Sequence, residues 1–489
     1  MKKTLIIISG ALALILHSCT WRKADLQKDI CAETGFPEDI GNILITRCAT
    51  AGCHNPQSKY AAANLDCSSW NELMNGAIGG TAIIPFSSAQ SFLVNFIITD
   101  TSLGTPQLPT MPFNPANPDA PDLLSLDEVL KIINWINDGA PDCNGNRLTD
   151  NPDRDKFYVI NQGCDLLYVF DADRRVVMRS LPLGANNQFI ESPHMIRFAP
   201  DKKHYYVSFI AGRYFQKFRT SDDTFIGQVD ITPGSWNTFS FSPDSKYAYI
   251  IDFNTPGRIA VVDCENMTPA SQFSVNPFNP DPGTFNSPHG SAVSPNGQFL
   301  YITMQLGNAL FKLDISDFPP DGQYINFTTP GTALPHEIAF SPVGDVYFVT
   351  CQGTNDVKIF NAVTDQYITS IPTAVDPVEM VFSTQKKHLY VTCMQGNSVT
   401  IINYETKTKI KDMFIGYEPH GIDVDEKRGL IYVACRNTGS NGGPPPHHTS
   451  SCGGRNGYLV AIDQNTLERK PNFKHELSVD PYGVLVRKP

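Results

Sequence analysis

The sequence has no long run of basic residues, and its formal net charge at pH 7 is −11. Proteins bind nucleic acid through lysine and arginine that neutralise phosphates, so nucleic acid is not an expected partner. After residue 18 there is also no apolar stretch close to the ~20 residues that span a bilayer. The 489 residues are 41% hydrophobic and 18% charged, which is enough apolar material for two or more globular domains.

The N-terminus predicts export and membrane attachment. Lys2 and Lys3 precede a mostly apolar segment, residues 4–16, which is too short for a transmembrane helix and is typical of a secretory signal. Residues 16–19, "LHSC", resemble a bacterial lipobox. The resemblance implies a signal peptide at 1–18, lipidation of Cys19 and a tether at 19–30. A plain signal peptide is the alternative. We expect a periplasmic or cell-surface protein in which disulfides persist, anchored to the outer membrane if it is lipidated.

Cys48, Cys53 and His54 form the first candidate site. The usual haem c motif is C-x-x-C-H, whereas "CATAGCH" has four residues between its cysteines. In such a site two thiols add to the porphyrin, the adjacent histidine binds iron, and methionine is a common second ligand. Met111 in "LPTMPF" lies between two prolines, in a stiff loop that suits this role.

A predicted helix follows this loop. Ser125 and Glu128 predict a capping box. Apolar residues then recur at the i, i+3, i+4, i+7 positions of one helix face, which holds Val129, Ile132, Ile133 and Ile136. The Met-Pro loop and a helix that ends "WINDGAP" resemble the small single-haem cytochrome c domains. The resemblance covers residues 31–143 and implies an all-α domain that binds haem c through Cys48 and Cys53, with His54 and Met111 as iron ligands.

Other interpretations of the cysteines stay open. A zinc site would need a fourth ligand that is not obvious, and a Cys48–Cys53 disulfide leaves His54 and the Met111 loop unexplained. The chain has twelve cysteines, and without Cys19 an odd number remains. A disulfide between two of the three cysteines that flank the haem elements is expected; these are Cys31, Cys67 and Cys143.

Residues 144–156 are polar and contain Gly and Pro, so we interpret them as a linker. From residue 157 the chain repeats a unit of about 40 residues, which predicts a β-propeller. Seven Tyr-rich second strands occur, from "KFYVINQ" to "LIYVACR". First strands are expected to start near Pro193, Pro233, Pro288, Pro335, Pro377, Pro419 and Pro481, and the second of these is irregular, with "PGSWN". The chain therefore enters on a second strand and must close the ring with its last strand, at 481–487. Residues 157–489 resemble the YVTN-type seven-bladed propellers.

Histidine follows the repeated proline in four blades, at His194, His289, His336 and His420. We expect these imidazoles to face one another across one rim of the channel. Cysteine or methionine ends several second strands, which we expect to return to the same rim; these residues are Met304, Cys351, Cys393 and Cys435. Imidazole and sulfur together favour copper, so a copper site with Cys351 and Cys393 is one hypothesis. The alternative is structural: the histidines bond to nearby carbonyl groups, and the cysteines are small buried residues.

The last blade carries the insertion "NTGSNGGPPPHHTSSCGGRNG", which contains His447, His448 and Cys452. One interpretation is a loop closed by a Cys435–Cys452 disulfide, and the other is a lid whose histidines face the channel.

Three functions remain open. The first is electron transfer between the haem and a redox partner protein or a small-molecule substrate held at the propeller rim. The second is a non-catalytic binding or scaffold propeller with an auxiliary haem. The third is a lactonase-like hydrolase, because lactone-cleaving propellers share this repeat. The carboxylates nearest to a catalytic pair are Glu337 and Glu379, although the sequence shows no clear constellation around them.

Overall fold

The computed structural model describes residues 29–113, 122–254, 257–274, 286–316, 324–327, 333–446, 450 and 452–487. The predicted signal peptide, the predicted lipidation site Cys19, and His447 and His448 lie outside these residues. In the described part of the chain, no helix is both long and apolar enough to cross a membrane.

The N-terminal unit is helical. Its α-helices are α1 (Ile30–Thr34), α2 (Glu38–Ile43), α3 (Trp70–Leu73), α4 (Phe92–Ile97) and α5 (Leu126–Asn137). Single helical turns are η1 (Leu44–Cys48), η2 (Lys59–Ala61), η3 (Ser88–Gln90), η4 (Thr101–Leu103) and η5 (Leu148–Asp150). The predicted capping box starts α5: the amide of Glu128 donates to Ser125 Oγ, and the amide of Ser125 donates to Glu128 Oε2.

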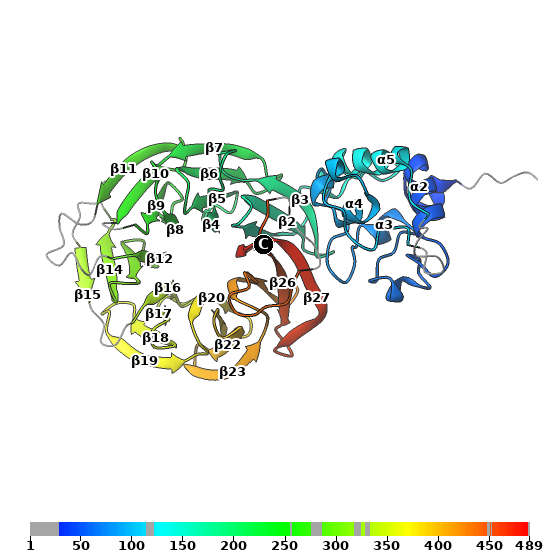
Figure 1. The fold of residues 1–489 in the computed structure, drawn as a ribbon. Coiled ribbons are helices and arrows are strands. Elements are labelled where there is room, and N and C mark those ends of the chain that lie inside the picture. Colours follow the sequence, from blue (N-terminus) through cyan, green and yellow to red (C-terminus); the bar gives the residue numbers. More distant parts are fainter. Residues whose placement is uncertain are drawn as a thin grey trace, which may run out of the picture.

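The rest of the described chain forms seven four-stranded antiparallel sheets around a channel, which confirms the seven-bladed propeller (Figure 1). The inner strands are β28 (Pro481–Val486), β4 (Pro193–Phe198), β8 (Trp236–Phe241), β12 (Pro288–Val293), β16 (Pro335–Phe340), β20 (Pro377–Ser383) and β24 (Pro419–Asp425). The second strands are β1 (Lys156–Asn161), β5 (His204–Phe209), β9 (Tyr247–Asp252), β13 (Phe299–Met304), β17 (Val346–Cys351), β21 (His388–Cys393) and β25 (Leu430–Cys435).

Two outer strands complete each blade. The third strands are β2 (Leu166–Asp171), β6 (Tyr214–Arg219), β10 (Arg258–Asp263), β14 (Ala309–Asp314), β18 (Asp356–Asn361), β22 (Ser398–Asn403) and β26 (Asn456–Asp463). The outermost strands are β3 (Val176–Pro182), β7 (Phe225–Asp230), β11 (Thr268–Ser274), β15 (Tyr324–Phe327), β19 (Tyr367–Pro372), β23 (Thr408–Phe414) and β27 (Glu468–Val479).

The two ends of the propeller share one blade, as predicted. Strand β28 pairs with β1 in the order β28-β1-β2-β3, with Phe157 opposite Val486 and Tyr158 opposite Leu485. The final strand therefore covers the inner edge of the first blade, which would otherwise expose unpaired backbone groups.

One inner strand starts later than its repeated proline. Six inner strands begin at the expected proline, but β8 begins at Trp236 and not at Pro233. The carbonyl group of Pro233 accepts a hydrogen bond from Arg258 Nη2 at 2.7 Å, and that of Thr232 accepts one from the Trp236 indole at 2.8 Å. These side-chain contacts hold residues 232–235 in a turn before the strand.

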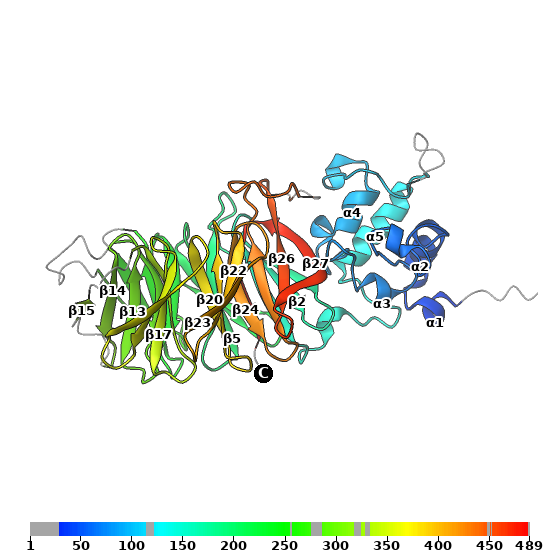
Figure 2. The same cartoon turned by 90° about the horizontal axis from the view of Figure 1, so that it is seen from below.

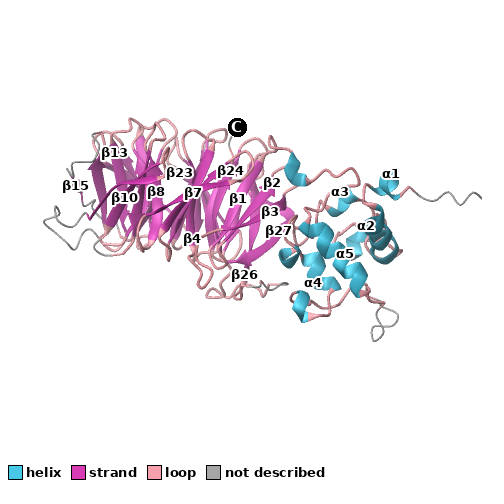
Figure 3. Ribbon diagram, turned by 90° about the horizontal axis from the view of Figure 1, so that it is seen from above, coloured by secondary structure: helices cyan, strands magenta, loops and turns pink. Residues whose placement is uncertain are grey.

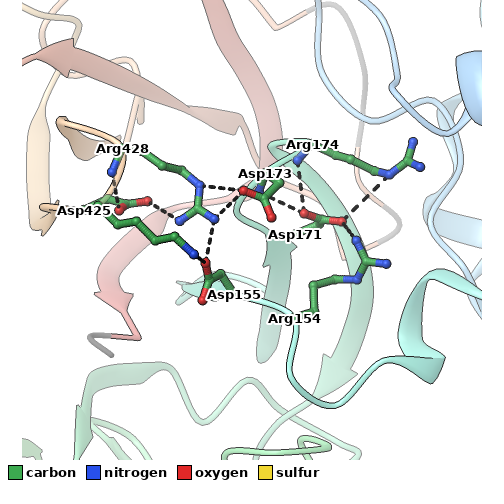
Figure 4. Close-up of polar contacts among 8 residues, drawn as sticks. Arg154, Asp155, Asp171, Asp173, Arg174, Asp425 and Arg428 are labelled. Atoms are coloured by element: carbon green, nitrogen blue, oxygen red, sulfur yellow. Dashed lines mark hydrogen bonds and ion pairs between the residues drawn. The ribbon is translucent and has the colours of Figure 1, made fainter.

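Charged side chains fasten the last blade to the first and to the linker (Figure 4). Arg428, in the turn after β24, bonds to Asp155 at 2.8 Å and to Asp425 at 3.1 Å, and it also contacts Asp173. A disulfide joins Cys164, in the turn between β1 and β2, to Cys452 in the insertion of the last blade. The predicted Cys435–Cys452 pairing is therefore wrong.

The helical unit docks against the outer edge of the propeller, beside strands β3 and β27 of the first and last blades (Figures 2 and 3). Residues of both parts form one hydrophobic cluster. Hydrogen bonds from backbone amides also cross the junction. The amide of Val177 donates to Thr81 Oγ1 at 2.7 Å, and the amide of Glu476 donates to the Gly79 carbonyl at 2.9 Å. A Cys31–Cys143 disulfide closes the helical unit and confirms that two of its three flanking cysteines pair.

Candidate functional site

An apolar cavity of about 350 Å³ lies inside the helical unit. Among the residues that line it are three of the four predicted haem-binding residues, Cys48, His54 and Met111, together with Cys67. The rest of the wall is mainly apolar and comes from Ala63, Leu65, Ala77, Ile78, Gly79, Gly80, Thr81, Ala82, Phe92, Leu93, Phe96 and Ile97. An apolar pocket with a few convergent polar groups is typical of a cofactor site.

A tight turn places Cys48 and His54 on the same cavity. Turn η1 ends at Cys48, and the amide of His54 donates back to the Cys48 carbonyl at 3.1 Å. His54 Nδ1 is buried and makes no hydrogen bond of standard geometry. Burial lowers the pKa of His54, although the carbonyl groups of Leu65 and Ala62 oppose this shift. The ring is therefore held neutral, which is the form that binds a metal.

Met111 lines the cavity, whereas Cys53 does not. The amide of Met111 donates to the Phe96 carbonyl at 2.7 Å, which fixes the predicted Met loop against the end of α4 beside the cavity. Cys53 is half-buried in the turn before His54 but does not line the cavity, and its carbonyl group accepts a hydrogen bond from Ser58 Oγ.

The predicted histidines do converge at one rim of the propeller channel. Their rings form a closed collar with Tyr482. The centroid distances are 6.0 Å for His194–His289, 3.7 Å for His289–His336, 5.9 Å for His336–His420, 3.7 Å for His420–Tyr482 and 4.3 Å for Tyr482–His194. All four histidines are buried, at 2–8% exposure.

The hydrogen bonds of the collar fit the structural interpretation at His194 alone. His194 Nδ1 lies 2.8 Å from Gln162 Oε1. His289, His336 and His420 each have a buried Nδ1 that makes no hydrogen bond of standard geometry. Nearby backbone oxygens act to raise the pKa of these three rings, but burial lowers it more, to about 4 for His289. The collar therefore consists of neutral imidazoles whose rings pack against one another across blades.

The structure does not bring Cys351 and Cys393 to the histidines. Both side chains are fully buried in apolar clusters between blades, and burial raises the pKa of their thiols to about 12 and about 11. Met304 and Cys435 are buried in similar clusters. Among the described residues, no three His, Cys, Asp or Glu side chains lie close enough together to hold a metal ion. The predicted copper site thus receives no support from this geometry.

A polar hollow further along the inner strands contains both glutamates that the sequence analysis named as hydrolase candidates. Its volume is about 450 Å³, and Glu337, Glu379, Arg197, Ser240 and Ser291 line it, together with apolar residues of the inner strands. Arg197 Nη2 lies 3.7 Å from Glu337 Oε1, and Arg197 Nη1 donates to the Phe239 carbonyl at 2.9 Å. The only signal in the sequence is positional, because both glutamates occupy the third position of their inner strands.

The two carboxyl groups of the hollow interact. Burial, followed by the charge of Glu337, raises the pKa of Glu379 to about 8, against the opposing effect of Arg197. Burial also raises the pKa of Glu337, which Arg197 again opposes. Glu337 Oε2 is buried without a hydrogen-bond partner. Two adjacent carboxyl groups that cannot both ionise easily at neutral pH are suited to general acid–base chemistry.

Comparisons with known proteins concern the propeller. The sequence model of a family described as "Lactonase, 7-bladed beta-propeller" matches residues 172–367. The propeller is similar to the lactonases. No curated protein matches the chain.

Solved structures support the same fold at low sequence identity. The periplasmic gluconolactonase of Pseudomonas aeruginosa is 16% identical, with a TM-score of 0.53 over 68% of this chain and 98% of its own. A candidate 6-phosphogluconolactonase of Bacteroides uniformis is 13% identical, with a TM-score of 0.52 over 68% and 99%. A protein of unknown function from Desulfotomaculum acetoxidans is 15% identical, with a TM-score of 0.52 over 68% and 98%. At these identities the likeness concerns the fold alone.

Proposed function

We propose that the propeller is a hydrolase that opens a lactone or a related ester in the hollow of its channel. The observation that carries this proposal is the grouping of Glu337, Glu379 and Arg197 in one cavity with the pKa of Glu379 raised to about 8. The similarity to lactonases supports the reaction class, and it favours hydrolysis over electron transfer as the role of the propeller.

The three side chains divide the reaction between them. Glu337, whose carboxylate faces Arg197, accepts a proton from water as the oxygen attacks the ester carbonyl carbon. Arg197 stabilises the negative charge that develops on the carbonyl oxygen. Glu379, protonated at neutral pH, gives its proton to the leaving alkoxide when the ring C–O bond breaks. The product is the hydroxy acid, and proton exchange with solvent restores both glutamates.

The test is hydrolysis of a panel of sugar and acyl lactones, followed by proton release and corrected for the uncatalysed rate. We expect Glu379→Gln to lower kcat by roughly 10²–10⁴-fold and to remove the alkaline limb of the pH profile, because it removes a general acid. Glu405→Gln, at an exposed ion pair with Lys387, is the control and should retain full activity. The proposal fails if the wild type is no faster than buffer, or if Glu379→Gln is fully active.

A second function concerns the helical unit, and we propose that it binds one haem c for electron transfer. The supporting observation is the apolar cavity, which Cys48, His54 and Met111 line. Cys48 and Cys53 would hold the haem covalently, and His54 and Met111 would be the iron ligands. Bound haem would supply one-electron chemistry with a redox partner protein. A chain lipidated at Cys19 would carry out both functions at a membrane facing the periplasm or the cell surface.

Absorption spectra and total metal content of the purified protein test this second function. Met111→Ala should abolish the methionine-to-iron band at the red end of the oxidised spectrum and leave the haem attached. Replacing both Cys48 and Cys53 with alanine should remove covalent haem in denaturing electrophoresis. Haem that survives this double substitution would contradict the assignment, and copper in the metal analysis would reopen the hypothesis of a rim site.

A further inference from the structure

Cys67 has no role in the proposed haem site, although it lies in the wall of the same cavity. Its side chain is 1% exposed and packs in the core of the helical unit beside Cys48. Two backbone hydrogen bonds bring these cysteines together. His54 N donates to the Cys48 carbonyl at 3.1 Å, and Cys67 N donates to the His54 carbonyl at 2.9 Å. His54 thus bonds to both cysteines through its backbone.

The two cysteines line the same cavity and belong to the same apolar cluster. The interaction of the two thiols lowers the pKa of Cys48 and raises that of Cys67. Cys53, the other cysteine of the motif, does not line the cavity. The lining of the cavity therefore selects Cys67, and not Cys53, as the partner of Cys48.

We propose that Cys48 and Cys67 form a disulfide in the haem-free chain, and that this bond competes with haem attachment at Cys48. The second half of this inference rests on the proposed haem site. The chain already contains two disulfides, Cys31–Cys143 and Cys164–Cys452, which is typical of a protein that folds in an oxidising compartment. A thiol pair in such a compartment is oxidised unless another reaction uses one of the thiols.

The chemistry balances with an oxidised dithiol carrier or glutathione disulfide as the co-reactant. The Cys48 thiolate attacks one sulfur of the oxidant and releases a thiolate. The Cys67 thiol then loses its proton and attacks the mixed disulfide, so that two protein thiols are oxidised while one external disulfide is reduced to two thiols. Haem attachment needs Cys48 as a free thiol, so a reducing dithiol must first reverse these steps. Oxidation would thus keep the cavity from accepting haem.

The first test maps disulfides in the full-length, haem-free chain after treatment with oxidised glutathione and blocking of free thiols with N-ethylmaleimide. Trypsin cleaves after Arg47 and Lys59 and so separates the peptide with Cys48 and Cys53 from the peptide with Cys67. We expect these two peptides to be joined through Cys48, with Cys53 alkylated. Cys53→Ser should keep the cross-link and Cys48→Ser should lose it. Alkylation of both Cys48 and Cys67, or a Cys48–Cys53 link, would overturn the proposal.

The second test measures covalent haem per chain after co-expression with a c-type maturation system. The yield from the wild type should rise with added dithiol reductant, whereas Cys67→Ser should reach that higher yield without it. Cys264→Ser, at a buried cysteine outside the cavity, is the matched control and should behave like the wild type. Equal yields from the wild type and Cys67→Ser, both without reductant, would overturn the competition. If no variant attaches haem, the proposed haem function fails, and the cross-link alone decides whether the disulfide exists.

Discussion

The ammonium group of Lys156 is buried. Its side chain is 2% exposed, and Nζ lies 2.8 Å from Asp223 Oδ2 and 2.8 Å from the Ser221 carbonyl. Tyr158 donates to the other Asp223 oxygen at 3.0 Å. Lys156 and Tyr158 belong to the first blade and Asp223 to the second, so this buried group joins two blades and leaves neither charge unpaired.

Removal of the lysine alone should cost far more than removal of an exposed ion pair in the same turn. We expect Lys156→Met to lower the free energy of unfolding by about 3–5 kcal/mol, because it leaves Asp223 buried without its partner. Arg219→Met, which breaks the exposed Arg219–Asp222 pair, should cost at most about 1 kcal/mol. Urea unfolding measures both values, and equal losses would contradict the explanation.

At the scale of elements, a threonine in the second strand repeats one bonding pattern in three successive blades. The hydroxyl of Thr350 accepts from the amide of Glu337 at 2.9 Å and donates to the Val378 carbonyl of the next blade at 2.9 Å. Thr303 and Thr392 bond in the same way, each to its own inner strand and to the next one. Each hydroxyl therefore satisfies two backbone groups and connects neighbouring blades.

Replacing one of these threonines tests how much this connection between blades stabilises the protein. Thr350→Val keeps the side-chain shape but leaves a buried amide and a buried carbonyl group without partners, which should destabilise the protein by about 1–3 kcal/mol. Thr364→Val, at an exposed turn position of the same blade, should change stability by no more than about 0.5 kcal/mol. Thermal unfolding compares the two, and a Thr350→Val protein as stable as the control would contradict the role.

At the scale of the whole molecule, the collar makes stability depend on pH. Burial lowers the pKa of His289 and of His475 to about 4, and it lowers the pKa of His194, His336 and His420. An unfolded histidine binds a proton near pH 6.5. The folded state is therefore favoured above pH 6.5, and this contribution is lost as the pH falls from 6.5 towards 4.

We expect His289→Gln to reduce the pH dependence of the unfolding free energy by about one proton between pH 6.5 and 4. Arg436 also faces the collar. Glu337 and Glu379 lie further along the channel and have raised pKa values, so their protonation in acid offsets part of the stability that the histidines lose. Tyr482→Phe is the control within the collar, since its phenol does not titrate in this range. Unfolding curves at several pH values give the slopes, and an unchanged slope for His289→Gln would contradict the role of burial.

The propeller fold was predictable because the sequence pattern that specifies it is local and repeated. Period-2 strands, turns and the Tyr-rich motif recur at a fixed spacing, and the chain's entry on a second strand requires closure by β28. The start of β8 could not be predicted, because Arg258, which lies far along the chain, holds Pro233 in a turn. The Cys164–Cys452 pairing also depends on closure of the ring, which brings residues 288 positions apart together.

The sequence by itself determined the seven-bladed repeat, the capped helix α5, the convergence of four histidines and three residues that share the apolar cavity, since each follows from spacing along the chain. Only the tertiary structure decided which of these residues meet. It buried Cys351 and Cys393 between blades and placed Cys67 beside Cys48. It also joined Glu337, Glu379 and Arg197 in one hollow. The physical reason is that side-chain contacts across a ring depend on the orientation of each strand and on burial, which sequence spacing does not specify.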